Sequence, residues 1–223
     1  MTKICLFKIP DNKSEEKLEG LFNDLPCSLK EKIQSTKHQK TRETRILVYS
    51  WLKESLNTLG IPYSKFDSDF AFSEKGKPYV ANCDIKFSLS HTDAVAAVAF
   101  SDEGEIGVDV EEINLSKADV TKKVASRFFG DTDVETDENL AVLELWTFDE
   151  SGFYKEAILP TAKKIESSDS FLKWTALEAA LKCNGGGFFA LGDKEHILKN
   201  IKLSSATVQI GKFFYAISLA KST

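Results

Sequence analysis

Acidic residues interrupt an apolar segment, IGVDVEE at residues 106–112, that otherwise has the composition of a β-strand. Side chains alternate along a strand, so Asp109 and Glu111 are expected on one face, and Val108 and Val110 on the other. Two carboxylates about 7 Å apart along one strand can converge on a hard cation, and carboxylate oxygens are the ligands that suit Mg²⁺. The alternative interpretation is an exposed edge strand whose acidic side chains are solvated.

A second pair of residues suited to chemistry, Glu178 and Lys182, lies four residues apart in the segment KWTALEAALK. In a helix this spacing puts both side chains on one face, and Ala179 and Ala180 beside them are expected to leave room for something bulky. A surface ion pair is the alternative interpretation. His91, one of three histidines, follows the apolar segment FSLS, where a structural role is more common than a ligand role.

Predicted strands and helices would position these residues. Alternating apolar residues predict strands, and a 3.6-residue period predicts helices. The strands are predicted at residues 3–9, 85–89, 94–100, 106–113, 208–211 and 213–220. The helices are predicted at residues 11–25, 28–59, 120–129, 140–146 and 173–187. Each half of the chain contains a helix ended by glycine and later a strand of small residues, which is a weak indication of internal duplication.

The composition narrows the class of protein. At 223 residues, 42% of them apolar, the chain can bury the core of one large domain or two small ones. A balance of 29 Lys and Arg against 34 Asp and Glu does not indicate a nucleic-acid binder. The N-terminus lacks the apolar run of a signal peptide and no run approaches membrane-spanning length, so we expect a cytoplasmic protein. Four scattered cysteines, with no CxxC pair, indicate neither a zinc site nor a disulfide framework.

The order of five short segments is more specific than any one of them. HQKTRETRIL, GKP, FSLSH, GVDVEE and FLKWTALEAALKCNGGGF follow one another along the chain. This order resembles the 4′-phosphopantetheinyl transferases of the surfactin-synthetase type, in which GKP, F-N-x-S-H-S, G-[IV]-D-x-E and W-[ST]-x-K-E-[AS]-x-x-K occur in the same sequence. The resemblance covers about residues 30 to 190.

The resemblance implies roles for individual residues. Asp109 and Glu111 match the family's metal-binding D-x-E, and Glu178 matches its third carboxylate, which together would hold one Mg²⁺. Lys182 matches the lysine that contacts the pyrophosphate of coenzyme A. The other implied cofactor contacts are Ser90 and His91 at the phosphate groups, Gly76, Lys77 and Pro78 at the adenine end, and Lys40 and Arg45 of the basic helix at the ribose 3′-phosphate. Glu112, on the opposite strand face, is not part of this site.

The implied reaction moves the phosphopantetheine arm of coenzyme A onto a serine of an apo carrier protein and releases adenosine 3′,5′-bisphosphate. That partner would serve fatty acid, polyketide or nonribosomal peptide synthesis. Glu178 is the candidate general base, Lys182 assists the leaving group, and His91 neutralises phosphoryl charge. The implied fold is an α+β pseudo-dimer of two similar halves, residues 1–105 and 106–223, with the active site between them in a monomer.

Two departures from the family pattern keep alternatives open. Leu177 stands where the family usually has lysine, and so a catalytically impaired relative that only binds coenzyme A or a carrier protein is the main alternative. LWTFDESGFYKE at residues 145–156 also resembles the W-T-x-K-E-S segment and offers Glu150 as a rival third carboxylate. The F-x-x-W spacing from Phe171 to Trp174 and the glycines after the helix favour Glu178. With Glu178 as the third carboxylate, residues 131–170 would be longer than usual in the family, as an insertion near the carrier-binding face. An unrelated Mg²⁺-dependent phosphohydrolase would explain the carboxylates but not the GKP and SH segments.

Overall fold

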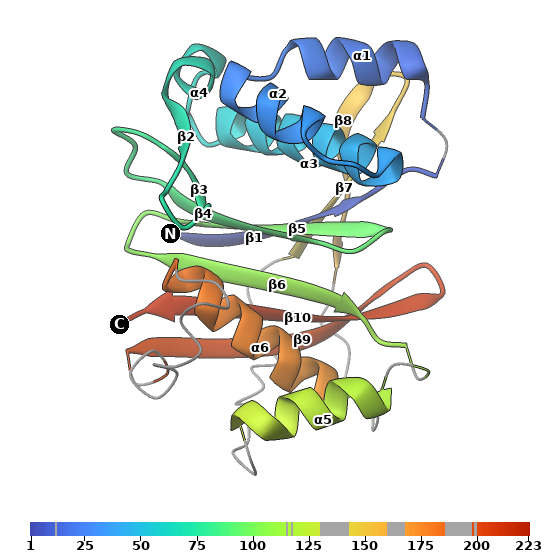
Figure 1. The fold of residues 1–223 in the computed structure, drawn as a ribbon, viewed down its shortest axis with the longest axis vertical. Coiled ribbons are helices and arrows are strands. Elements are labelled where there is room, and N and C mark those ends of the chain that lie inside the picture. The colour runs from blue at the N-terminus through green and yellow to red at the C-terminus, as the bar shows by residue number, and fades with distance from the viewer. Residues whose placement is uncertain are drawn as a thin grey trace.

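Strand β1 (Thr2–Lys8) is apolar on both faces, and both faces are covered. Cys5 and Phe7 pack against helices, whereas Ile4 and Leu6 pack against a second sheet. The structure, a computed structural model, describes residues 1–11, 13–114, 116, 118–129, 143–159, 168–185, 198 and 200–223. These residues form an α+β structure in which helices and two sheets are arranged in layers (Figure 1).

The first sheet contains β1 at its centre and has the strand order β4-β5-β1-β7-β8. Its other strands are β4 (Lys86–His91), β5 (Val95–Ser101), β7 (Leu143–Asp149) and β8 (Gly152–Leu159). The β1–β7 pair is parallel and the other pairs are antiparallel. Its outer face is covered by α1 (Glu15–Asn23), α2 (Cys27–Gln34), α3 (Gln39–Thr58) and α4 (Tyr63–Asp69) (Figure 1). A short hairpin of β2 (Phe70–Phe72) and β3 (Pro78–Val80) follows α4.

The second sheet is antiparallel, with the order β6-β10-β9. Its strands are β6 (Ile106–Glu112), β9 (Ile201–Ile210) and β10 (Phe213–Ser222). One face packs on the first sheet through residues such as Val108 and Ile217, and the other face carries α6 (Asp169–Cys183), with α5 (Ala118–Phe129) beside it (Figure 1). Among the described helices, none combines the length and apolar character needed to cross a lipid bilayer.

Helix α6 packs unusually closely on β6. A Cβ built on Gly107 would lie 1.9 Å from the carbonyl oxygen of Ala179 and 2.5 Å from the amide nitrogen of Cys183. Only a glycine fits there, because real Cβ atoms do not approach backbone to these distances. Ala179 and Ala180 are fully buried. The expectation that they leave room for a ligand was therefore wrong, since they let the helix backbone approach the strand.

Most predicted elements are confirmed, but α4, β2, β3 and β8 had no predicted counterpart, and some predictions differ from the structure. Residues 140–146 were predicted to be helical, but Leu143–Asp149 is strand β7, whose Leu143 and Leu145 point into the space between the sheets. The single helical pattern predicted over residues 28–59 is divided into α2 and α3, which are separated at residues 35–38. The described part of the expected insertion, residues 143–159, forms β7 and β8 of the first sheet. Residues 130–139, whose sequence GDTDVETDEN is rich in acidic residues, lie outside the described residues.

The predicted halves, residues 1–105 and 106–223, do not coincide with the two sheets. Strands β7 and β8 belong to the second half of the chain, yet β7 pairs with β1 of the first half, with Ile4 opposite Leu143. Each half does place one long helix, α3 or α6, against a sheet (Figure 1).

Candidate active site

Four of the predicted site residues gather where the edge strand β4 of the first sheet meets the edge strand β6 of the second: Ser90, Asp109, Glu178 and Lys182. The hydroxyl of Ser88 accepts a hydrogen bond of 3.1 Å from the backbone N–H of Val108, which ties the two strands together. Side chains alternate along β4, so Ser88 and Ser90 face β6 while Phe87 and Leu89 face the helices.

A buried polar cluster lies at this junction. Asp109 is only 3% exposed, and its Oδ1 accepts hydrogen bonds from the hydroxyl of Ser90 at 2.6 Å and from Nζ of Lys182 at 2.5 Å. Lys182 also donates a hydrogen bond of 2.9 Å to Ser90 Oγ. The second oxygen of the carboxylate, Asp109 Oδ2, is buried and has no hydrogen-bond partner among the described residues. A buried acceptor left unpaired is costly, so this oxygen marks a place where a cation or donor would be stabilising.

Glu178 adds a second carboxylate to the cluster. Its Oε2 lies 3.8 Å from Nζ of Lys182, and its side chain is 20% exposed. Burial, reinforced by the negative charges of Asp109 and Glu111, raises the pKa of Glu178 to about 7, although Lys182 acts in the opposite direction. A carboxyl group with such a pKa can accept or release a proton near neutral pH, which is what a general base requires.

The three carboxylates predicted for Mg²⁺ are neighbours but do not form a closed metal site. Within the described part of the chain, no three acidic, histidine or cysteine side chains are gathered closely enough to hold a metal ion. Glu111 nevertheless acts electrostatically on Glu178 from the same face of β6 as Asp109. The unpaired Oδ2 of Asp109 and the mutual repulsion of the carboxylates fit a divalent cation, because oxygen ligands and excess negative charge are what Mg²⁺ requires.

A basic rim lies beside this acidic cluster. The side chain of His91 reaches solvent, but the protein around it lowers its pKa below the usual value, and the positive charges of Arg45 and Lys182 act in the same direction. Arg45 donates a hydrogen bond of 2.6 Å to Thr36 Oγ1. A histidine that lies among cations in this way suits a ligand that brings its own negative charge.

Lys32 belongs to the same rim, although the sequence did not identify it as a site residue. Its Nζ lies 3.5 Å from the centroid of the Phe72 ring and 4.0 Å from the position that a Cβ on Gly76 would take. Burial and the charge of Arg45 lower the pKa of Lys32. Two cations that repel each other fit a polyanionic ligand, because an anion would offset their repulsion.

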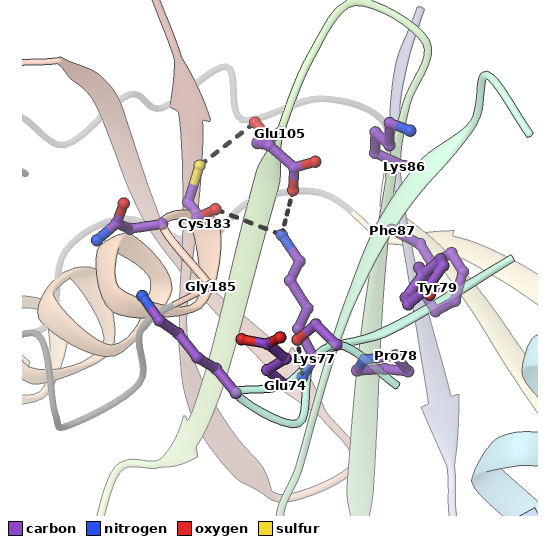
Figure 2. A pocket seen from close by; sticks show the side chains of 12 residues that line it. Glu74, Lys77, Pro78, Tyr79, Lys86, Phe87, Glu105, Cys183 and Gly185 are labelled. Carbon is purple, nitrogen blue, oxygen red and sulfur yellow. Dashed lines mark hydrogen bonds and ion pairs between the residues drawn. The ribbon is translucent and has the colours of Figure 1, made fainter. Parts of the chain in front are cut away.

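The GKP segment forms the turn between β2 and β3. Gly76 has a φ of 86°, a left-handed conformation that favours glycine. Nζ of Lys77 lies 2.6 Å from Glu105 Oε2 and donates to the carbonyl oxygens of Ile106, at 3.1 Å, and Cys183, at 3.4 Å. Figure 2 shows this ammonium group between Glu105 and the C-terminal end of α6. Lys77 therefore fastens the turn to the second sheet and to α6.

Two cavities adjoin the turn. The larger has a volume of about 480 Å³, within the range of small-molecule sites, and its lining includes Pro78, Tyr79, Phe87 and Lys86 (Figure 2). The smaller, about 220 Å³, is lined by Gly76, Ser88 and Lys182 among others. Both cavities are also lined by Lys75, Lys77, Pro78 and Gly185. A cleft thus runs along the GKP turn towards the buried polar cluster.

Two candidates from the sequence pair with residues outside the buried polar cluster. Lys40 pairs with Asp93 at 2.7 Å, and both side chains are well exposed to solvent. Glu150 is 94% exposed and pairs with Lys17 of α1 at 2.8 Å, in the turn between β7 and β8. The structure therefore brings Glu178, and not Glu150, next to Asp109.

The departure at Leu177 has a packing explanation. The side chain is 2% exposed and belongs to an apolar cluster that α6 forms with the outer face of the second sheet, including Ala220. A lysine at this position would have to bury its charge in that cluster, which is unfavourable. Leu177 thus stabilises the docking of the helix that carries Glu178 and Lys182.

A scan of the chain against protein-family models found no match, and neither did a search of curated proteins.

Proposed function

We propose that this chain transfers the 4′-phosphopantetheine arm of coenzyme A to a serine hydroxyl of an apo carrier protein. The observation that carries the proposal is the cluster of Ser90, Asp109, Glu178 and Lys182 at the end of a cleft that begins at the GKP turn. Four segments that are far apart in sequence, and that occur in the same order in the phosphopantetheinyl transferases, meet at this one place.

The cleft suits the charge pattern of coenzyme A. Lys32 and Arg45 supply positive charge beside the GKP turn, His91 lies near Arg45, and Lys182 lies at the far end. The larger cavity, with Tyr79 and Phe87 in its lining, has the size and the aromatic surface for a nucleoside. Cations at one side and an apolar pocket at the other are what a nucleotide with several phosphate groups requires.

The acidic cluster would hold the metal ion of the reaction. Asp109 and Glu178, with Glu111, are the residues that would bind Mg²⁺, which supplies neutralisation of the charge on the phosphoryl oxygens. Glu178 accepts the proton of the carrier serine. The serine oxygen then forms a bond to the β-phosphorus, and the bond from this phosphorus to the bridging oxygen breaks. Lys182 and His91 stabilise the departing adenosine 3′,5′-bisphosphate, whose phosphate keeps the electron pair.

The experiment is to incubate the protein with coenzyme A, Mg²⁺ and several apo carrier domains, and to weigh the carriers by intact mass spectrometry. We expect at least one carrier to gain the mass of one phosphopantetheine. The matched variants are Glu178→Gln, which should stop transfer, and Glu150→Gln, which should not. A protein that binds coenzyme A but modifies no carrier would instead support the binding-only alternative, and transfer that survives Glu178→Gln would remove the base assignment.

A further inference from the structure

Lys182 lies between the carboxylates of Asp109 and Glu178. Its Nζ is 2.5 Å from Asp109 Oδ1 and 3.8 Å from Glu178 Oε2, and it also contacts Ser90 Oγ at 2.9 Å. Asp109 comes from β6 and Glu178 from α6, so one ammonium group links the two elements. Lys182 therefore acts as the counter-ion of the carboxylates that would bind Mg²⁺.

This pairing is incomplete. Asp109 Oδ2 stays buried without a partner among the described residues, and Glu178 Oε2 lies 3.8 Å from Nζ of Lys182, which is beyond hydrogen-bond distance. A single positive charge does not balance the buried carboxylate of Asp109, the partly buried carboxylate of Glu178 and the nearby Glu111. The two carboxylates can therefore still attract a divalent cation. The ammonium group of Lys182, however, is bonded to Asp109 Oδ1 and blocks that oxygen from the cation.

Lys182 has another position available to it. Its side chain is 29% exposed and lines the smaller cavity together with Gly76 and Ser88. A lysine side chain is a flexible four-carbon stem with a compact charge, so it can turn from the carboxylates to the cavity at small conformational cost. An anion in that cavity would attract the ammonium group, since it lies in the same cleft.

We propose that Lys182 is an exchangeable counter-ion, which neutralises Asp109 and Glu178 until a diphosphate enters the cleft and then turns to that diphosphate. The identity of the diphosphate as coenzyme A rests on the function proposed above. Divalent metal and coenzyme A should then bind with strong positive coupling, because the ligand that attracts Lys182 also frees the carboxylates. Such coupling is reciprocal, so each ligand raises the affinity for the other by the same factor.

The test measures binding of Mn²⁺, as a spectroscopically visible substitute for Mg²⁺, by the electron paramagnetic resonance signal of the free ion. Wild-type protein should bind Mn²⁺ weakly when alone and at least about tenfold more tightly with saturating coenzyme A and no carrier. Lys182→Met should bind Mn²⁺ alone about tenfold or more tightly than wild type, because loss of a charged hydrogen bond of this kind is worth at least about one factor of ten. Lys155→Met is the matched control, because it also replaces a lysine that lies next to a glutamate carboxylate, that of Glu144. This variant should leave the Mn²⁺ affinity unchanged.

Circular dichroism first establishes that Lys182→Met is folded, and Lys182→Gln serves as the second variant if it is not. The proposal is overturned if the folded variant binds Mn²⁺ no more tightly than wild type. It is equally overturned if coenzyme A changes the wild-type affinity for Mn²⁺ by less than about threefold. These results are independent of the carrier assay: transfer without the predicted metal binding would refute only the counter-ion role, and the predicted binding without transfer would refute only the proposed function.

Discussion

Glu144 and Glu178 are two partly buried glutamates, each near a lysine, and they differ in what else surrounds them. Lys3 lies 2.9 Å from Glu144 Oε2, which also accepts a hydrogen bond of 3.2 Å from the indole N–H of Trp146, and Lys155 lies 3.5 Å from Oε1. Burial alone would raise the pKa of Glu144, but Lys3 and these other partners outweigh it and lower the pKa. At Glu178, burial and the negative charges of Asp109 and Glu111 outweigh the effect of Lys182, so the pKa rises to about 7.

The contrast separates a structural carboxylate from one suited to chemistry. The two side chains have similar exposure, 14% and 20%, so burial by itself does not distinguish them. What differs is the sign of the neighbouring charges. A site that keeps like charges together carries a cost in stability, and such a cost is typical of positions retained for binding or catalysis.

The largest expected effect that distinguishes the two glutamates is on transfer activity. Glu178→Gln should lower kcat/KM by about 100- to 1,000-fold, the usual loss when a group that stabilises a transition state or moves a proton is removed. Glu144→Gln should change kcat/KM per folded molecule by less than about threefold, because the side chain lies in β7, away from the cleft. Steady-state rates of carrier modification measure both, and equal losses would show that the distinction is mistaken.

Stability should respond in the opposite order. Glu144→Gln leaves Lys3 without its closest carboxylate and should lower the free energy of unfolding by about 2 kcal/mol at pH 7. Glu178→Gln removes a charge that repels Asp109, so the free energy of unfolding should stay equal or rise. Urea titrations in the presence of EDTA measure both values. A larger loss for Glu178→Gln than for Glu144→Gln would contradict the charge balance described above.

The pH dependence follows from the two pKa shifts. The folded protein holds the Glu178 proton up to about pH 7, whereas the unfolded chain releases it near the ordinary value of 4.5. The folded state therefore binds more protons in this window, and the contribution of Glu178 to stability falls as the pH rises from 4.5 to 7. Relative to wild type without metal, Glu178→Gln should gain on the order of 1 to 2 kcal/mol between pH 5 and pH 8.

Glu144 should show the reverse dependence. Its folded pKa lies below 4.5, so its contribution is present above that pH and is lost as the pH falls through the folded value. The cost of Glu144→Gln should accordingly shrink on acidification below pH 4.5, in the same series of urea titrations. Parallel pH profiles for the two variants would rule out the assignment of opposite shifts.

The smallest effect is expected for the outer lysine at Glu144. Lys155 is 49% exposed and lies 3.5 Å from the carboxylate, which keeps the closer Lys3 when Lys155 is replaced. Lys155→Met should therefore change the free energy of unfolding by about 0.5 kcal/mol or less, as is usual for exposed ion pairs. A loss as large as that of Glu144→Gln would mean that the two lysines cannot replace each other.

Much of the fold could be predicted from the sequence, because a strand with one buried face requires an apolar residue at every second position. The prediction failed at β7, since the leucine-rich LELW suits either structure and the parallel pairing with β1 depends on residues that are almost 140 positions away. The division of residues 28–59 into two helices was missed because the period of apolar residues continues on both sides of residues 35–38.

The alternation of Asp109 and Glu111 and the helical spacing of Glu178 and Lys182 were predictable, since both are local. That Lys182 contacts Asp109 was not, because this contact depends on how closely α6 approaches Gly107. Lys32 was missed as an individual candidate for the same reason: its place depends on the hairpin that brings Phe72 over it. Glu105 and Cys183, which hold Lys77, lie far from it in sequence, and no local signal points to them.

The parallel pairing of β1 with β7 has a consequence for how the chain is assembled during synthesis. β1 leaves the ribosome before the other described strands, but one of its two edges finds no partner until residues 143–149 have followed. A chain interrupted at residue 105 would expose this edge, and unpaired strand edges associate with other chains. The first sheet is therefore completed late, and the cleft at its border with β6 forms only when most of the chain is present.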